Sequence, residues 1–191
     1  MNTRSKEEGG MIKRVKEMYQ TITRTKIKVG EKAPKIRGKS YYKGEIREYE
    51  MKEEKGKYHV IAFYCRDFSR ICPKEIKEIS ENIDKFKELK TEVIGISVDS
   101  VEEHKRMCSR KDEKGIGEIE IELIEDVNHQ ITESYGLLSI IGVSNRATII
   151  IDDKGIVRRV DIHSMITGRN VKEIINELKN IITIDKKKNQ N

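Results

Sequence analysis

The stretch from Tyr58 to Ser80, YHVIAFYCRDFSRICPKEIKEIS, constrains the fold most strongly. Its apolar run at residues 59–64 has the length and the bounds of a buried strand. A short polar turn follows, and Cys72 and Pro73 then open an amphipathic helix. Proline suits a first helical position because its fixed φ is helical and its missing N–H would have had no partner there. The stretch therefore predicts a strand, a turn and a helix, with a cysteine at the helix start.

Cys72 is a candidate nucleophile because of this position. The open N–H groups and the positive end of the helix dipole favour a thiolate over a thiol. Arg66 and Arg70 add positive charge in the preceding turn. A buried, inert thiol is the alternative, since most free cysteines pack as small apolar side chains. The helix start, the adjacent proline and the two arginines favour the reactive thiolate.

The composition excludes several classes of protein. The net charge is +6, but basic and acidic residues are interleaved and aromatic residues make up only 5%, so a solvated surface is favoured over a nucleic-acid interface. We find no apolar run of membrane-spanning length, no secretory signal, no nucleotide-binding motif and no metal-ligand spacing, so no membrane, cofactor or metal is expected. The three cysteines indicate redox thiols in a reducing, cytoplasmic compartment.

The length of 191 residues suggests one domain with flanking segments. Residues 1–26 form an N-terminal extension that carries a short apolar stripe at helical spacing and is expected to be partly helical. Residues 27–184 form the domain. Residues 185–191 are expected to be a disordered basic tail.

The order of the expected elements predicts an α/β fold. The central strand, the Cys72 helix and a buried strand at 92–99 imply a parallel crossover. Ser100 and Glu103 form a capping box that starts the next helix. The apolar residues Ile76, Ile79, Ile83 and Phe86 continue the Cys72 helix. The remaining expected elements are a hairpin at 36–42 and 45–49, an edge strand at 119–124, a small helix at 126–135, a hairpin of strands 147–151 and 156–162, and a last helix at 170–182. We expect a mixed sheet with helices on both faces and Cys72 at the C-terminal end of a central strand, where open α/β folds place their sites.

From about residue 29 to residue 178 the chain resembles the peroxiredoxins, thiol peroxidases with a thioredoxin-like fold. VGEKAP resembles the opening of that family, and FYCRDFSRICPKE resembles its active-site stretch, P-x-x-x-T/S-x-x-C. EVIGISVDS, the YG at 135–136, IIIDDKG and TGRN match further segments in the same order. The overall pattern resembles the alkyl hydroperoxide reductase C branch. The resemblance implies a central mixed β-sheet of thioredoxin type flanked by helices.

The resemblance also implies roles for individual residues. Cys72 is the expected peroxidatic cysteine, which attacks a peroxide oxygen and becomes a sulfenic acid. Ser69 stands at the Thr/Ser position, where its hydroxyl holds the thiolate and the peroxide oxygen. Arg146 matches the arginine that pairs with the thiolate, and Glu75 and Arg169 match the residues that position these charges.

The chain departs from the family pattern at its cysteines. Cys65 stands at the position of the motif proline, which normally shields the thiolate. This exchange has three alternative consequences. Turnover of peroxide is slowed or abolished, or Cys65 supplies a second thiol that condenses with the sulfenic acid, or Cys65 is simply a small buried thiol in place of the proline. No cysteine follows Cys108, so the resolving cysteine of a C-terminal arm is absent. Cys108 has the spacing of a resolving cysteine in the thiol peroxidase branch; a buried core cysteine is the alternative.

We therefore expect a peroxidase that reduces hydrogen peroxide and small alkyl hydroperoxides, with Cys108, Cys65 or an external thiol resolving the sulfenic acid. A thioredoxin-like dithiol is the expected reductant, and a homodimer or larger homo-oligomer the expected assembly. The alternative is a degenerate member of the family that acts as a redox sensor or as a holdase-like binding protein.

Overall fold

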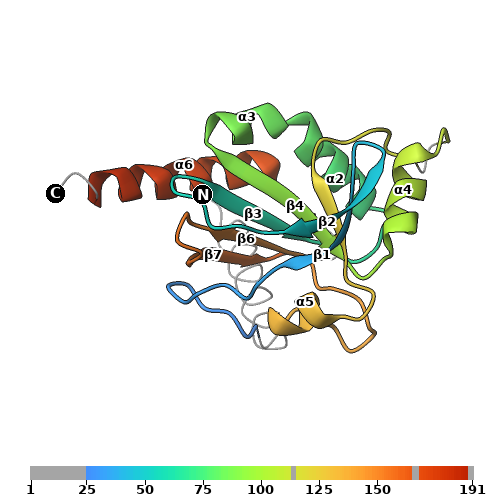
Figure 1. The fold of residues 1–191 in the computed structure, drawn as a ribbon, viewed down its shortest axis with the longest axis horizontal. Helices are drawn as coiled ribbons and strands as arrows, with labels where there is room; N and C mark the ends of the chain where they lie inside the picture. The colour runs from blue at the N-terminus through green and yellow to red at the C-terminus, as the bar shows by residue number, and fades with distance from the viewer. Residues whose placement is uncertain (1–24, 113–114, 165–167, 189–191) are drawn as a thin grey trace, which may run out of the picture.

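The computed structural model describes residues 25–112, 115–164 and 168–188, and the predicted helical stripe of the N-terminal extension lies outside these residues. In the described part, seven strands form one mixed sheet in the order β2-β1-β5-β4-β3-β6-β7 (Figure 1). The strands are β1 (Arg37–Tyr42), β2 (Glu45–Glu50), β3 (Tyr58–Phe63), β4 (Thr91–Ser97), β5 (Glu122–Glu125), β6 (Ala147–Ile151) and β7 (Val157–Ile162). The helices are α2 (Cys72–Glu81), α3 (Ile83–Glu88), α4 (Val101–Ser109), α5 (Gln130–Ser134) and α6 (Val171–Lys188).

The strand β3 is central, as its apolar run predicts. All six of its residues are buried, and it pairs in parallel with β4 and antiparallel with β6. The parallel crossover from β3 through α2 and α3 to β4 is confirmed, and so are the β1–β2 and β6–β7 hairpins. The capping box at the start of α4 is also present, with the Ser100 hydroxyl accepting from the Glu103 N–H.

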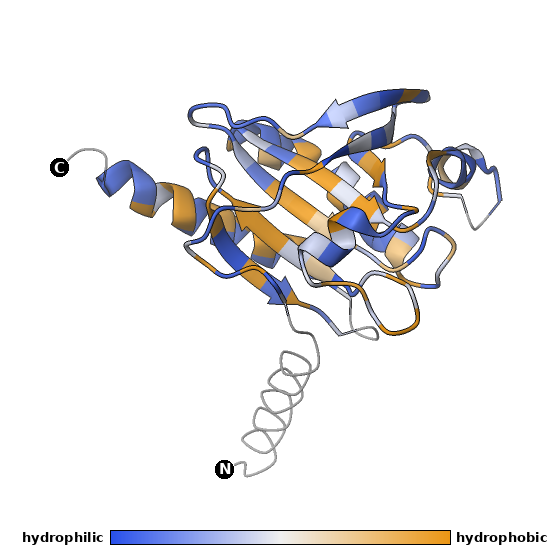
Figure 2. Cartoon of the chain, turned by 60° about the horizontal axis from the view of Figure 1, so that its bottom comes forward, coloured by the Kyte–Doolittle hydropathy of each residue, from blue (hydrophilic) through white to orange (hydrophobic). Residues whose placement is uncertain are grey.

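Two hydrophobic cores form because side chains alternate between the two faces of the strands. Val60 and Ala62 of β3 face the larger core, which α2, α3, α4 and α6 cover. Ile61 and Phe63 face the smaller core, which α5 covers together with the chain before β1 (Figure 1). Figure 2 shows the apolar strands running through the centre and hydrophilic residues on the outer segments. Helices on both faces agree with the prediction.

Several elements differ from the prediction; the predicted small helix at 126–135, for example, is shorter and begins only at Gln130. The strand β5 is interior rather than an edge, because β1 pairs with its outer side through Ser40 and Tyr41. The helix that begins at Cys72 breaks at Asn82, whose backbone N–H bonds back to Ile79 and closes α2 before α3 begins. The helix α6 continues to Lys188, so residues 185–188 belong to a helix rather than to a disordered tail.

The end of α6 is anchored by one carboxylate. Asp185 accepts a hydrogen bond of 2.8 Å from the Tyr58 hydroxyl and pairs with Arg158 at 2.5 Å. These contacts tie the last helical turns to the start of β3 and to β7. They explain why the helix continues beyond its apolar face, which the sequence periodicity alone did not reveal.

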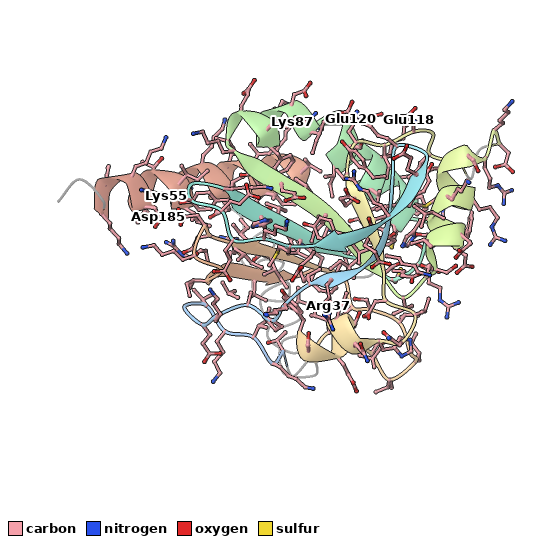
Figure 3. All side chains as sticks on the ribbon, in the orientation of Figure 1. Arg37, Lys55, Lys87, Glu118, Glu120 and Asp185 are labelled. Carbon is pink, nitrogen blue, oxygen red and sulfur yellow. The ribbon has the colours of Figure 1, made fainter. Side chains whose placement is uncertain are left out.

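The surface carries charges of both signs. In Figure 3 the labelled side chains of Lys87 and Glu120 project from the same edge of the molecule, where they form an ion pair of 2.6 Å. Among the helices of the described residues, none is both long enough and apolar enough to cross a membrane.

Candidate active site

The turn between β3 and α2 holds the candidate nucleophile. The strand ends at Phe63, and α2 begins at Cys72, which is fully buried and is followed by Pro73 at the first helical turn. The backbone N–H of Cys72 donates to the Ser69 hydroxyl at 3.2 Å. The predicted strand, turn and helix therefore place the thiol at the C-terminal end of a central strand.

Arg146 reaches this thiol from the neighbouring strand. It immediately precedes β6, and the β3–β6 pairing sets Ala147 opposite Phe63, so Arg146 lies beside the end of β3. Its Nη2 donates to the Cys72 sulfur at 3.1 Å, and its Nη1 donates to the Ser164 carbonyl at 3.1 Å. The guanidinium is almost completely buried, at 1% exposure. A cation held in this way favours the thiolate form of Cys72.

Glu75 joins two arginines. It lies three residues after Cys72 on α2, so both side chains occupy the same side of the helix. One carboxylate oxygen pairs with Arg146 Nε at 3.0 Å, while the other accepts from the Arg169 backbone N–H at 2.6 Å and lies 3.5 Å from Arg169 Nε. Arg169 Nη2 also donates to the Phe63 carbonyl at 2.5 Å. The carboxylate thus fixes the two cations relative to the end of β3.

Burial and pairing act in opposite directions on these charges. Burial raises the pKa of Glu75, and Arg169 and Arg146 oppose that rise. Burial lowers the pKa of Arg169, against the effect of Glu75. For Arg146, burial acts downward, but the hydrogen bond to the Cys72 thiolate and the charges of Cys72 and Glu75 leave its pKa raised. Two anions and two cations therefore share a buried site, with each charge next to an opposite one.

Cys65 lies directly against the nucleophile. The two sulfurs are 2.9 Å apart, and Cys65 is 7% exposed. A hydrogen bond from the Cys65 thiol is the largest cause that lowers the pKa of Cys72 to about 4; burial opposes it, and Ser69, Arg146 and the Arg66 backbone add to it. The same hydrogen bond, then burial, raises the pKa of Cys65 well above its ordinary value. One proton is thus kept on Cys65 while Cys72 is a thiolate.

The other residues singled out from the sequence lie elsewhere. Arg66 and Arg70, expected to supply positive charge, have exposed side chains, and the cation that contacts the sulfur is Arg146. Cys108 lies on α4 and is buried in the larger core, to which Cys72 also belongs, but no hydrogen bond joins the two thiols in the part of the chain that the structure describes. Burial raises the pKa of Cys108 to about 12, so it remains a thiol.

A buried polar network that the sequence did not reveal anchors the turn. Asp67 is fully buried, pairs with His104 Nδ1 at 2.7 Å and accepts from the Tyr64 hydroxyl at 2.8 Å. Its backbone N–H donates to Asp99, which also accepts from the Ser97 hydroxyl. A charged residue in a turn is normally expected to be exposed. Asp67 is buried because its partners come from segments that are distant in the sequence, and a local sequence pattern does not reveal them. The network holds the turn to β4 and α4.

No group of three or more potential metal ligands occurs among the residues that the structure describes. The nucleophilic groups that the site does present are the thiols of Cys72 and Cys65. A buried thiolate at a helix start, held by an arginine on a sheet of thioredoxin type, defines a thiol-dependent redox site.

Comparisons with known proteins agree with this class. Residues 29–160 match the model of the AhpC/TSA family, and the chain belongs to this family. Peroxiredoxin-4 of Bos taurus is 36% identical over 168 residues, which cover 87% of this chain and 61% of that protein. A Drosophila melanogaster protein named mitochondrial thioredoxin-dependent peroxide reductase is 36% identical over 165 residues, or 85% of this chain and 70% of that protein.

A solved structure confirms the fold. The reduced 2-Cys peroxiredoxin of Plasmodium vivax superposes with a TM-score of 0.78 at 33% identity, over 83% of this chain and 98% of that one. The predicted thioredoxin-like α/β fold and the peroxiredoxin resemblance are thus confirmed. The chain spans about three fifths of the bovine relative's length.

Proposed function

We propose that the protein is a thiol-dependent peroxidase that reduces hydrogen peroxide and small alkyl hydroperoxides through Cys72. One observation carries the proposal: a buried cysteine at a helix start whose sulfur accepts a hydrogen bond from Arg146 at 3.1 Å and whose pKa is lowered to about 4. The thiolate is the nucleophilic form of cysteine, and the lowered pKa favours this form at neutral pH.

In the proposed reaction the Cys72 thiolate attacks one peroxide oxygen. The new S–O bond forms as the O–O bond breaks, and the leaving oxygen departs as an alkoxide or hydroxide that takes up a proton. Besides the Cys65 thiol, Arg146 and the Ser69 hydroxyl favour the charged form of the Cys72 sulfur, so they stabilise the charge that moves from sulfur to oxygen. Glu75 and Arg169 act as positioning residues, because their contacts fix the direction of the Arg146 guanidinium.

The proposal also includes the reductant, the oligomeric state and the cellular compartment of the protein. The sulfenic acid has to be reduced, and a thioredoxin-like dithiol is the proposed donor, in line with the name of the fruit-fly relative. We expect a homodimer or larger homo-oligomer; the adjacent exposed side chains of Ile140 and Ile141 support such a contact. A reducing compartment such as the cytoplasm is expected from the unpaired cysteines.

A second candidate function rests on a different observation. Cys72 is fully buried and the Cys65 sulfur lies directly against it, so peroxide reaches the thiolate only if the turn at 65–71 opens. If the turn stays closed, the protein is a degenerate peroxiredoxin that serves as a redox sensor or a holdase-like binding protein.

Peroxide consumption with a thioredoxin system as reductant separates the two functions. The wild-type chain and the Cys108→Ala control are expected to turn over hydrogen peroxide, while Cys72→Ser is expected to be inactive, because the nucleophile is missing. Circular dichroism checks that each variant is folded. Activity retained in Cys72→Ser would contradict the assignment of the nucleophile. An inactive wild type would support the sensor function if Cys72 is still oxidised by peroxide, and the binding function if its thiols resist oxidation.

A further inference from the structure

The pair of sulfurs at the end of β3 has chemistry beyond peroxide attack. We propose that Cys65 is the resolving cysteine and that it forms a disulfide with Cys72 inside the active-site turn. This inference rests on the proposed function, since it requires the sulfenic acid that peroxide produces on Cys72.

The geometry favours Cys65 over Cys108. The Cys65 and Cys72 sulfurs are 2.9 Å apart, and a disulfide bond is about 2.0 Å long, so they need to approach by only about 0.9 Å. Cys108 lies on α4 within the larger core, and no hydrogen bond joins it to Cys72 among the described residues, whereas thiol–disulfide chemistry requires contact between the sulfurs. The nearest thiol is therefore already in place in the folded turn.

The shared proton sets the order of the two reactions. In the reduced protein the Cys65 thiol donates its hydrogen bond to the Cys72 thiolate, which keeps Cys65 protonated and Cys72 nucleophilic. Once Cys72 is a neutral sulfenic acid, the negative charge that held this proton is gone. Burial still raises the pKa of Cys65, whereas Ser69 and Arg146 lower it and so assist the loss of its proton. The second nucleophile thus becomes available only after the first has reacted.

The proposed step balances as follows. The Cys65 thiol loses its proton and its sulfur attacks the Cys72 sulfur, so that the S–S bond forms and the S–O bond breaks. The departing hydroxide combines with a proton and leaves as water. Two thiols are oxidised to one disulfide, while hydrogen peroxide is reduced to two waters, or an alkyl hydroperoxide to an alcohol and water. A dithiol reductant of thioredoxin type then restores both thiols by thiol–disulfide exchange.

A resolving thiol this close has a consequence for overoxidation. A sulfenic acid that persists can react with a second peroxide to give a sulfinic acid, which is not restored by ordinary thiols. Because Cys65 is in contact with Cys72, the sulfenic acid is consumed without unfolding of α2. We therefore expect the wild-type protein to resist sulfinic acid formation during turnover.

The test begins with the reduced full-length protein and one equivalent of hydrogen peroxide. Remaining thiols are alkylated, and peptides are mapped by mass spectrometry under non-reducing conditions. The expected products are a Cys65–Cys72 link and an alkylated Cys108. A Cys72–Cys108 link, or an oxidised Cys72 without any link, would overturn the inference while leaving the proposed function standing. A Cys72 that remains a reduced thiol would overturn the proposed function itself.

Three variants sharpen the result. Cys65→Pro restores the residue of the family motif, and Cys65→Ser keeps the size of the side chain if the proline does not fold well. Both are expected to oxidise at Cys72 once, to accumulate sulfinic acid with excess peroxide, and to lose turnover with a thioredoxin system. Cys108→Ala is the matched control and is expected to keep both the link and the turnover. Undiminished turnover in both Cys65 variants would refute the assignment.

Discussion

The low pKa of Cys72 predicts a pH dependence of stability that can be measured by removing this one thiol. In the folded protein the thiol loses its proton at a pKa of about 4, against an ordinary value of 9.0. Between these two values the folded state holds one proton fewer than the unfolded state, so the thiolate stabilises the fold increasingly as the pH rises. The gain is complete above 9.0 and is lost as the pH falls through about 4.

The magnitude follows from linkage. One proton of difference corresponds to about 1.4 kcal/mol per pH unit, so the free energy of unfolding should gain about 4 kcal/mol from this group between about pH 5 and about pH 8. That is a large share of the roughly 5–15 kcal/mol that stabilises a typical domain. The Cys72→Ser variant lacks the group, and Cys65, whose pKa in the folded protein is raised above its ordinary value, keeps its proton below about pH 8. The difference in stability between wild type and variant should therefore grow with pH at this slope.

Urea unfolding followed by circular dichroism, with a reductant and constant salt, gives the required free energies. Cys108→Ala is the matched control, because burial raises the pKa of Cys108 to about 12 and both folded and unfolded states keep that proton below about pH 8. Its stability difference from wild type should be independent of pH. A flat difference for Cys72→Ser as well would mean that Cys72 is protonated in the folded protein, and the proposed nucleophile would lose its basis.

Two further predictions concern the neighbours of the thiolate. Ser69→Ala should lower the second-order rate constant for peroxide by about 10- to 100-fold, because a hydrogen bond to a charged group contributes about 1.5–3 kcal/mol. Ser69→Thr keeps the hydroxyl and should stay near the wild-type rate. A peroxide competition assay measures both rate constants. Glu75→Gln should lower the free energy of unfolding by about 3–5 kcal/mol, because it leaves the buried Arg146 and Arg169 without their shared carboxylate. In urea unfolding the exposed Glu78→Gln control should change stability by less than about 0.5 kcal/mol, and an equal effect of both substitutions would contradict the role of Glu75.

The sequence predicts those parts of the fold that depend on local pattern. The apolar run of β3, the capping box at Ser100 and the proline after Cys72 each specify an element through contacts within a few residues, and all three are found as expected. The strand β5 is different, because its alternating residues are compatible with an edge and only the distant hairpin strand β1 covers it. The break at Asn82 is likewise invisible in the apolar spacing, since Ile83 and Phe86 remain buried on either reading.

In the candidate site, too, local sequence signals predict some residues, while others depend on contacts between distant segments. Cys72 is recognisable from local signals, but Arg146, Glu75 and Arg169 were predicted only through the family resemblance, since the sheet pairing that brings Arg146 to the thiol spans most of the chain. The buried pair of Asp67 and His104 was not predicted, because neither residue type nor spacing indicates a partner 37 residues away.

Cys65, which the sequence predicts at the position of the motif proline, therefore affects more than the shielding of the thiolate. A proline ring has no proton to donate, whereas the Cys65 thiol donates one to the Cys72 sulfur and so lowers the pKa of Cys72. Because the two groups share this proton, the titration near pH 4 belongs to the pair, and the second proton leaves only well above the ordinary range. A pair that kept both protons would lack a nucleophile, and a pair that lost both would place two negative charges 2.9 Å apart. Only the singly protonated pair can both attack a peroxide and keep a thiol in reserve, which is why the proposed peroxidatic and resolving roles are best explained together.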